Sequence, residues 1–253
     1  MRFASLGSGS RGNATLVSHQ KTTLLVDCGF SAKETEKRLQ RLNINADALT
    51  AIVITHEHSD HISGVRVLAR KYNLPVYATV GTASCLAADV MGLVNEFSSH
   101  ERFTINDIEI NPFPVPHDAR EPSQFVFNNG NHSLGLLTDV GISTPVIEQA
   151  LSGCNALLLE ANHDMEMLDN SVYPEHLKYR VSGRLGHLNN VQSSKLLEKI
   201  DTSHLQHIVA MHLSEKNNSP NIVAPLFSQA LNCDQSWVGI ADQNTGFDWR
   251  ELS

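Results

Sequence analysis

The chain has 253 residues, of which 41% are hydrophobic and 18% charged, and its formal net charge is −8. This composition supports a sizeable folded core and argues against a surface that is basic overall and coats nucleic acid. No stretch approaches the roughly 20 apolar residues of a membrane span, and the N-terminus lacks a signal-peptide core, so we expect a cytoplasmic protein. The cysteines form no CxxC pair, which indicates free thiols in a reducing compartment: Cys28, Cys85, Cys154 and Cys233.

The N-terminal half is predicted to begin with strands and to continue with helices and strands in alternation. Ser31 and Glu34 have the spacing of a capping box, which predicts that a helix starts near Ala32. The predicted elements, in chain order, are strands at 2–6, 14–18 and 22–27, a helix from 32, a strand at 51–54, and helices near 62–72 and 82–91.

The C-terminal half is predicted to repeat this succession. Its elements are strands at 108–115, 124–128 and 133–138, a helix at 145–151, a strand at 156–160, a helix at 191–200, a strand at 208–211, a helix near 221–231 and a strand at 237–240. No linker or internal repeat divides the chain, so we predict a single domain over residues 1–253. Two similar halves of this kind favour a layered α/β (α+β) fold over a doubly wound parallel sheet.

Residues 7–12, GSGSRG, follow a predicted strand and match the GxGxxG pattern of dinucleotide-binding proteins. That fingerprint requires a helix that opens at the last glycine, whereas here the glycines lead into β-branched residues without helical periodicity. We interpret the segment as a glycine-rich turn that either contacts a substrate phosphate or only reverses the chain. The candidate substrate-binding side chains are Ser8, Ser10, Arg11 and Asn13.

Residues 55–61, THEHSDH, place metal-seeking side chains directly after the predicted buried strand 51–54. Imidazole and carboxylate groups bind ions such as Zn²⁺ and Mn²⁺, and His56 and His58, two positions apart, can point the same way. Asp60 and His61 can serve a second ion where the chain enters the next helix. Further ligands are expected where strands end at the same edge of the core, and three residues end apolar runs in this way: His117, Asp139 and His212.

The HxHxDH pattern with these later residues resembles the metallo-β-lactamase fold superfamily, and the resemblance spans nearly the whole chain. It implies an αββα sandwich with a binuclear site at one edge of the sheets, holding two divalent ions, Zn or Mn. It also implies that Asp139 bridges the two metals and that Asp27 supports the ligand loop. One metal would be held by His56, His58 and His117, and the other by Asp60, His61 and His212.

The segments LGSGSRGNAT, VDCGF and HLSEKNN resemble the YycJ (WalJ) subgroup, which is associated with 5′-to-3′ DNA exonuclease activity. For the last metal ligand, His163, His176 and His187 compete with His212. We favour His212 because a strand delivers it, whereas His176 lies in a polar, helix-like segment. LLLEANH and RLGHLNN resemble the RNase Z branch, in which a Glu and a His cooperate beside the metals. The predicted catalytic residues are Asp60, Glu160 and His187, with His187 as general acid.

Differences between this sequence and other branches of the superfamily narrow the range of expected substrates. Asp139 stands where the commonest β-lactamases have cysteine. The 22-residue gap from His117 to Asp139 leaves no room for the RNase Z exosite arm, and the gap from Asp139 to His212 is too short for a β-CASP domain. We therefore expect a compact hydrolase in which two metals, about 3.5–4 Å apart, bind a bridging hydroxide that attacks a phosphodiester.

A nucleic acid, with DNA favoured, is the predicted partner. Lys178, Arg180 and Arg184 lead up to His187, and Arg11 lies in the glycine-rich turn. These cations can contact a nucleic-acid backbone although the net charge of the chain is negative. One alternative is a small-molecule hydrolase acting on a cyclic phosphodiester, a lactone or a thioester. Another is a non-catalytic, metal-stabilised module that binds nucleic acid. Cys28 is interpreted as a buried, inert thiol.

Overall fold

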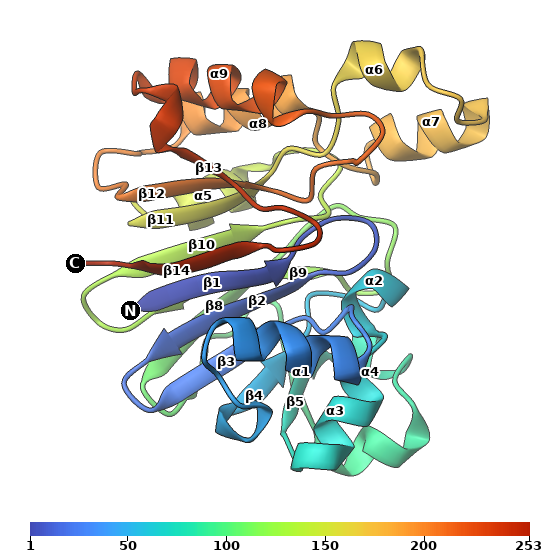
Figure 1. Cartoon of the computed structure of the whole chain (residues 1–253), viewed down its shortest axis with the longest axis vertical. Coiled ribbons are helices and arrows are strands. Elements are labelled where there is room, and N and C mark those ends of the chain that lie inside the picture. The colour runs from blue at the N-terminus through green and yellow to red at the C-terminus, as the bar shows by residue number, and fades with distance from the viewer.

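The computed structural model describes residues 1–253 and consists of two seven-stranded sheets packed face to face, with helices on both outer faces (Figure 1). Each sheet combines antiparallel hairpin-type pairs with parallel pairs. The predicted layered αββα sandwich is therefore confirmed, and a doubly wound parallel sheet is excluded.

The first sheet, sheet A, draws its strands from both ends of the chain. In spatial order it contains β14 (Phe247–Glu251), β1 (Arg2–Gly7), β2 (Ala14–His19), β3 (Thr22–Val26), β4 (Ala51–Val53), β5 (Val76–Thr79) and β6 (Val94–Phe97). The GSGSRG segment is the turn between β1 and β2, and no helix follows it. The C-terminal β14, which was not predicted, pairs antiparallel with β1.

The second sheet, sheet B, is formed by strands between residues 103 and 240. In spatial order it contains β13 (Val238–Ile240), β12 (His207–Met211), β11 (Ala156–Glu160), β10 (Ser133–Leu137), β9 (Ser123–Asn128), β8 (Ile108–Pro114) and β7 (Phe103–Ile105). The pairs from β10 to β13 are parallel, so the carboxyl ends of β10, β11 and β12 meet at one edge. That edge carries the site described below.

Helices cover the outer faces of both sheets (Figure 1). Sheet A is covered by α1 (Ala32–Arg41) and α3 (Val65–Tyr72), and sheet B by α5 (Pro145–Leu151), α8 (Asn190–Lys199) and α9 (Pro220–Leu231). Two further helices, α6 (Met165–Asp169) and α7 (Glu175–Ser182), extend beyond the sheet edge on the right of Figure 1. None of the helices combines the length and the apolar character that a membrane crossing requires.

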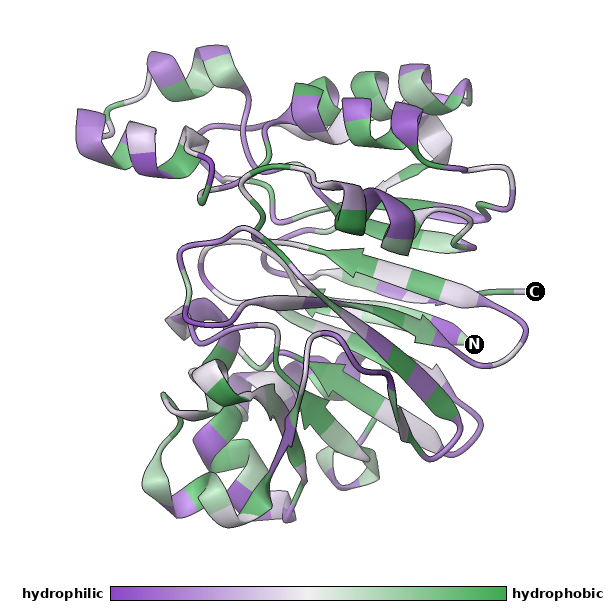
Figure 2. Ribbon diagram, turned by 180° about the vertical axis from the view of Figure 1, so that it is seen from behind, coloured by the Kyte–Doolittle hydropathy of each residue, from purple (hydrophilic) through white to green (hydrophobic).

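Apolar side chains form three layers of core. The central layer lies between the two sheets, where Phe3, Phe125 and Phe127 are fully buried, and the other two lie between each sheet and its helices. Figure 2 shows hydrophobic residues concentrated along the strands and many hydrophilic residues on the helices. Because the strands are packed on both faces, they are largely apolar, and their polar residues gather at the ends.

Two predicted helices differ from the structure. The helix predicted near 62–72 is divided into α2 (Ser59–Ile62) and α3, because the Gly64 N–H donates to the Cys28 carbonyl at 2.8 Å instead of to a carbonyl of the preceding turn. The prediction of a helix near 82–91 was wrong. The structure has a four-residue helix, α4 (Val80–Ala83), then an extended Ala87 and a 3₁₀ turn at Ala88–Leu93.

Candidate metal centre

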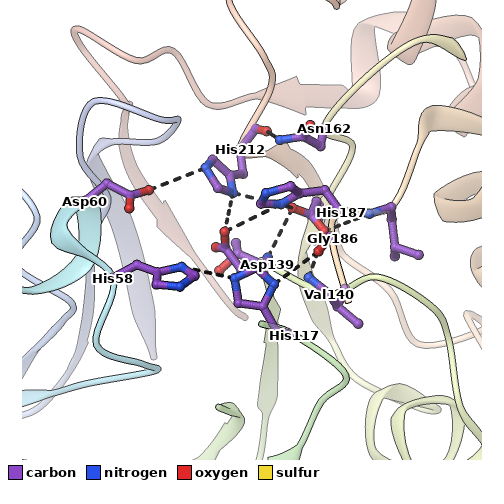
Figure 3. Close-up of polar contacts among 12 residues, drawn as sticks. His58, Asp60, His117, Asp139, Val140, Asn162, Gly186, His187 and His212 are labelled. Carbon is purple, nitrogen blue, oxygen red and sulfur yellow. Dashed lines mark hydrogen bonds and ion pairs between the residues drawn. The ribbon is translucent and has the colours of Figure 1, made fainter. Parts of the chain in front are cut away.

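The predicted metal ligands lie together at one edge of the sandwich and come from both sheets. Figure 3 labels His58, Asp60, His117, Asp139 and His212 among them. The HxHxDH segment follows β4 of sheet A, and the other ligands follow β8, β10 and β12 of sheet B. Asp139 and His212 both have positive φ, 55° and 54°. This left-handed conformation is unfavourable for residues other than glycine, and such strain gathers at functional sites.

Three groups of side chains at this edge have ligand atoms close enough for a shared ion. Within each group these atoms lie within 4.8 Å of one another. Asp139 is common to two groups and His56 to two, so the groups merge into one cluster. The groups are His56, His58 and His117; His56, His61 and Asp139; and Asp139, Glu160, His187 and His212.

Asp60 joins this cluster from the start of α2. Its Oδ2 lies 3.4 Å from His61 Nε2 and 3.8 Å from His212 Nε2. Asp139 reaches the same two histidines from the other side, with its Oδ2 3.2 Å from His61 Nε2 and its Oδ1 3.0 Å from His212 Nδ1. The second predicted ligand set is therefore also assembled, with Asp139 between the two sets.

Each histidine of the N-terminal motif uses one ring nitrogen to hold its orientation. His61 Nδ1 is 2.8 Å from Asp27 Oδ2, and His56 Nδ1 is 3.0 Å from the Thr55 hydroxyl. The same Asp27 carboxylate accepts the Thr55 backbone N–H and hydroxyl, each at 2.8 Å, so it fixes the start of the ligand loop. Metal-binding histidines usually have such an outer partner, which leaves the second nitrogen free to bind.

His117 and His58 follow the same rule. His117 Nδ1 donates to the Gly186 carbonyl at 3.1 Å, and His58 Nε2 donates to the Asp118 carbonyl at 3.2 Å. Their remaining nitrogens, His117 Nε2 and His58 Nδ1, lie 3.2 Å apart. Two histidine lone pairs therefore converge beside His56.

Buried charges around Asp139 favour positive charge in the cluster. Burial opposes the charged form of His61, but Asp139 and Asp27 raise its pKa well above the usual value. Burial likewise opposes charge on His212, yet Asp139 and Glu160 raise its pKa to about 10. Burial also opposes the charged form of Asp139. His212 and His61 outweigh burial and hold the pKa of Asp139 well below its usual range.

The cluster fits divalent cations. His56 Nε2, Asp139 Oδ2 and His212 Nδ1 are buried and make no hydrogen bond of normal geometry, although the last two atoms lie 3.2 and 3.0 Å from other ligand atoms. Buried polar atoms are rarely left unpaired, and all three of these atoms face the other members of the cluster. A mixed set of imidazole and carboxylate ligands suits Zn²⁺ or Mn²⁺, so these residues are able to hold metal.

Within the cluster, Glu160 and His187 form a pair that the predicted metal ligand sets do not include. His187 Nδ1 is 2.9 Å from Glu160 Oε1. Glu160 is fully buried at the end of β11 and accepts the backbone N–H groups of Asp139, Val140 and Leu188 at 3.1, 3.0 and 3.1 Å. Burial raises the pKa of Glu160, but His187 and the hydrogen bonds outweigh it and lower the pKa to about 2. The carboxylate therefore stays charged and orients the His187 ring.

Comparison with known proteins identifies the family. The model of the beta-lactamase superfamily domain matches residues 22–213. The chain belongs to the beta-lactamase superfamily. Exodeoxyribonuclease YycJ of Bacillus anthracis is 38% identical over 245 residues, which cover 95% of this chain and 93% of that protein. Exodeoxyribonuclease WalJ of Streptococcus pneumoniae is 37% identical over 223 residues, 86% of this chain and 83% of that protein.

A solved structure supports the same fold for this superfamily member. The metallo-β-lactamase fold protein YhfI of Bacillus subtilis superposes with a TM-score of 0.76 over 99% of both chains, at 15% identity. The predicted resemblance to this superfamily and to YycJ and WalJ is therefore confirmed. The prediction of a hydrolytic metalloenzyme is confirmed with it, because the close relatives are exodeoxyribonucleases of this superfamily.

The glycine-rich turn of this beta-lactamase superfamily member packs against the cluster of candidate metal ligands. The Ser8 hydroxyl accepts the His212 backbone N–H at 2.9 Å. Asn13 Nδ2 donates to Asp60 Oδ2 at 3.2 Å and lies 3.1 Å from His61 Nε2. Ser8 and Asn13 are both buried. They were predicted to contact substrate, but their contacts are with the ligands, which they hold in place.

The other predicted substrate contacts lie nearer the surface. Ser10 lines the cleft in front of the cluster. Arg11 is exposed, and its guanidinium lies 2.5 Å from Glu215 Oε1 and 2.9 Å from Asn244 Oδ1. Arg184 is exposed and is not part of the cleft lining. Of the competing histidines, His176 is exposed on α7, away from the cluster, which supports the choice of His212.

A cleft of about 240 Å³ opens in front of the cluster. Asp60, Asp139, His187 and His212 form one side of it, and α7 with the residues before it forms the other. Arg180 was predicted near the site, but the sequence did not reveal the apolar residues of this second wall or the role of Asp118, which directly follows a predicted ligand. Arg180 of α7 donates to Asp118 Oδ2 at 2.6 Å, which ties α7 to the loop carrying His117.

Proposed function

We propose that the chain is a metal-dependent phosphodiester hydrolase, a DNA exonuclease, folded as a single domain over residues 1–253. The observation that carries the proposal is the complete cluster of imidazole and carboxylate ligands, with unpartnered buried atoms, in a chain 38% identical to an exodeoxyribonuclease over nearly its whole length. We further propose that digestion proceeds from the 5′ end, as the resemblance to YycJ and WalJ implies.

The proposed cofactors are two divalent ions, Zn or Mn. His56, His58 and His117 would hold one ion, and Asp60, His61 and His212 the other, with Asp139 shared between them. When bound, such ions lower the pKa of a water and offset the charge of a phosphate. Asp27, Ser8 and Asn13 keep the ligands oriented before the substrate arrives.

The chain's own contribution to bond cleavage is a proton for the leaving group. His187 lines the cleft with 20% of its side chain exposed, and its Nδ1 is held by Glu160. The opposite ring nitrogen, Nε2, is then the one able to donate a proton into the cleft. A departing sugar alkoxide is a poor leaving group, so protonation in the transition state favours cleavage.

The proposal is tested with purified protein, Mn²⁺ or Zn²⁺, and a panel of substrates. DNA labelled at either end, in single and double strands, RNA, bis(p-nitrophenyl) phosphate, a lactone, a thioester and a β-lactam are offered in parallel. We expect nucleotides to be released from the 5′ end of DNA, with no hydrolysis of a β-lactam. Efficient lactone or thioester turnover, with no cleavage of any nucleic acid or model diester, would instead favour a small-molecule hydrolase.

A further inference from the structure

The two sides of the cleft differ in chemical character. The cluster side and the loop after β12 contribute only polar and charged side chains, apart from a glycine. The apolar side chains of the lining all come from one short segment of the chain, residues 173–181: Tyr173, Leu177 and Val181. In Figure 1 this segment, with α7, stands apart from the sandwich and faces the site edge.

We propose that Tyr173, with Leu177 and Val181, binds the nucleobase next to the scissile phosphate. This inference rests on the proposed function, and it adds a residue that contacts the substrate. A nucleotide has an anionic phosphate and a flat, largely apolar base, and these match the two sides of the cleft. The phosphate lies against the cluster, and the base lies against the Tyr173 ring. Stacking on an aromatic ring accepts every base, because all bases have a π-face.

A cation lies over one face of this ring. Lys216 Nζ is 5.7 Å from the centre of the Tyr173 ring, and Lys216 is exposed on the loop that follows His212. We expect the base to stack on the opposite face of the ring and the exposed ammonium to contact the phosphate of the neighbouring nucleotide. Polar lining groups on the same loop, Ser214 and Asn217, belong to the cleft as well.

The apolar wall has a fixed position relative to the candidate acid. The His187 backbone N–H donates to the Val181 carbonyl at 2.8 Å, so the end of α7 is tied to the residue that faces the leaving group. A Cβ at Gly186 would collide with the carbonyl oxygens of Arg180 and Val181, so the chain closes tightly here. A preformed wall loses little entropy when a base binds.

The cleft volume of about 240 Å³ is below that of typical ligand pockets, roughly 300–1,000 Å³, so a single base rather than a base pair is the expected occupant. We therefore expect the base on Tyr173 to be unpaired when its phosphodiester is cleaved. An enzyme built this way acts on single strands, or on duplex ends whose last nucleotide has frayed.

A double-mutant cycle between the ring and the base tests the inference. Wild type, Tyr173→Ala, Tyr173→Phe and the control Tyr179→Ala are assayed on two single-stranded DNAs, one with a normal terminal nucleotide and one with an abasic terminal residue. Tyr179 is on α7, the helix that follows Tyr173, but it is 74% exposed and lies outside the cleft. On normal DNA we expect Tyr173→Ala to lose roughly tenfold in kcat/KM, and Tyr173→Phe and Tyr179→Ala to lose little. On abasic DNA Tyr173→Ala should equal wild type.

A binding measurement in EDTA separates this inference from the proposed function. With 2-aminopurine at the DNA end, wild type and Tyr173→Phe should quench its fluorescence by stacking, and Tyr173→Ala should not. Equal losses for Tyr173→Ala on both DNAs, or quenching unchanged in Tyr173→Ala, would overturn the inference while leaving the nuclease in place. Wild type that cleaves no DNA with either metal would overturn the proposed function itself. Thermal unfolding of each variant checks that it is folded.

Discussion

Replacing His187 by alanine should remove acid catalysis and leave metal binding intact. Glu160 keeps its three backbone N–H donors in this variant, so its buried charge stays hydrogen-bonded and the fold should persist. A positioned acid contributes roughly 10²–10⁴ in rate, which corresponds to about 3–5 kcal/mol of barrier. We expect a loss of that size on a DNA phosphodiester, whose leaving group is a strongly basic alkoxide.

The assay compares two leaving groups at equal metal content. On bis(p-nitrophenyl) phosphate, His187→Ala should lose far less, because p-nitrophenolate is stable as an anion and needs little protonation. His176→Ala is the matched control, since His176 is an exposed histidine outside the cluster. Elemental analysis should find the same metal content in wild type and both variants. Equal losses on the two substrates, or metal missing from His187→Ala, would refute the assignment of the acid.

Three further predictions concern the ligands and their supports. Asp139→Ala should reduce bound metal below two ions per chain and abolish most turnover; full occupancy by elemental analysis would contradict the shared role of Asp139. Removing metal with EDTA should lower the Tm by roughly 5–10 °C, because an ion at about 100 times its Kd adds about 2.7 kcal/mol to the folded state, and an unchanged Tm would argue against metal held at this edge. Ser8→Ala should cost about 1–3 kcal/mol in chemical denaturation, since the His212 N–H loses its buried acceptor. A variant as stable as wild type would show that the N–H finds another partner.

The convergence of the candidate ligands was predictable because their signal in the sequence is local. Each candidate ligand directly follows an apolar run that predicts a strand, so both signals lie in the same short stretch of sequence. His56, His117 and His212 are examples. The two-sheet fold followed from the same runs of strands. The choice of His212 over His176 rested on the strand before it, and β12 and the exposed position of His176 agree with that choice.

Features that depend on distant contacts were not predictable. Ser8 and Asn13 are polar residues in a glycine-rich turn, and nothing local indicates that the HxHxDH segment folds over them and buries them. The apolar wall around Tyr173 depends on Gly186 packing against the end of α7, which brings a polar-looking helix to the cleft. Strand β14 has only partly buried or exposed residues, so its apolar pattern is weak, and its place is fixed by pairing with β1.

The origin of the ligands in both sheets has a consequence for how long the folded chain survives. An ion held by His56 of sheet A and His117 or Asp139 of sheet B is a cross-link between the two halves of the sandwich. The sheets cannot separate until that cross-link opens, so bound metal should slow unfolding itself and lengthen the half-life of the native state. Resistance to a protease, timed with and without metal, would measure this effect. A chain that loses its ions would then become inactive and open to degradation at the same moment.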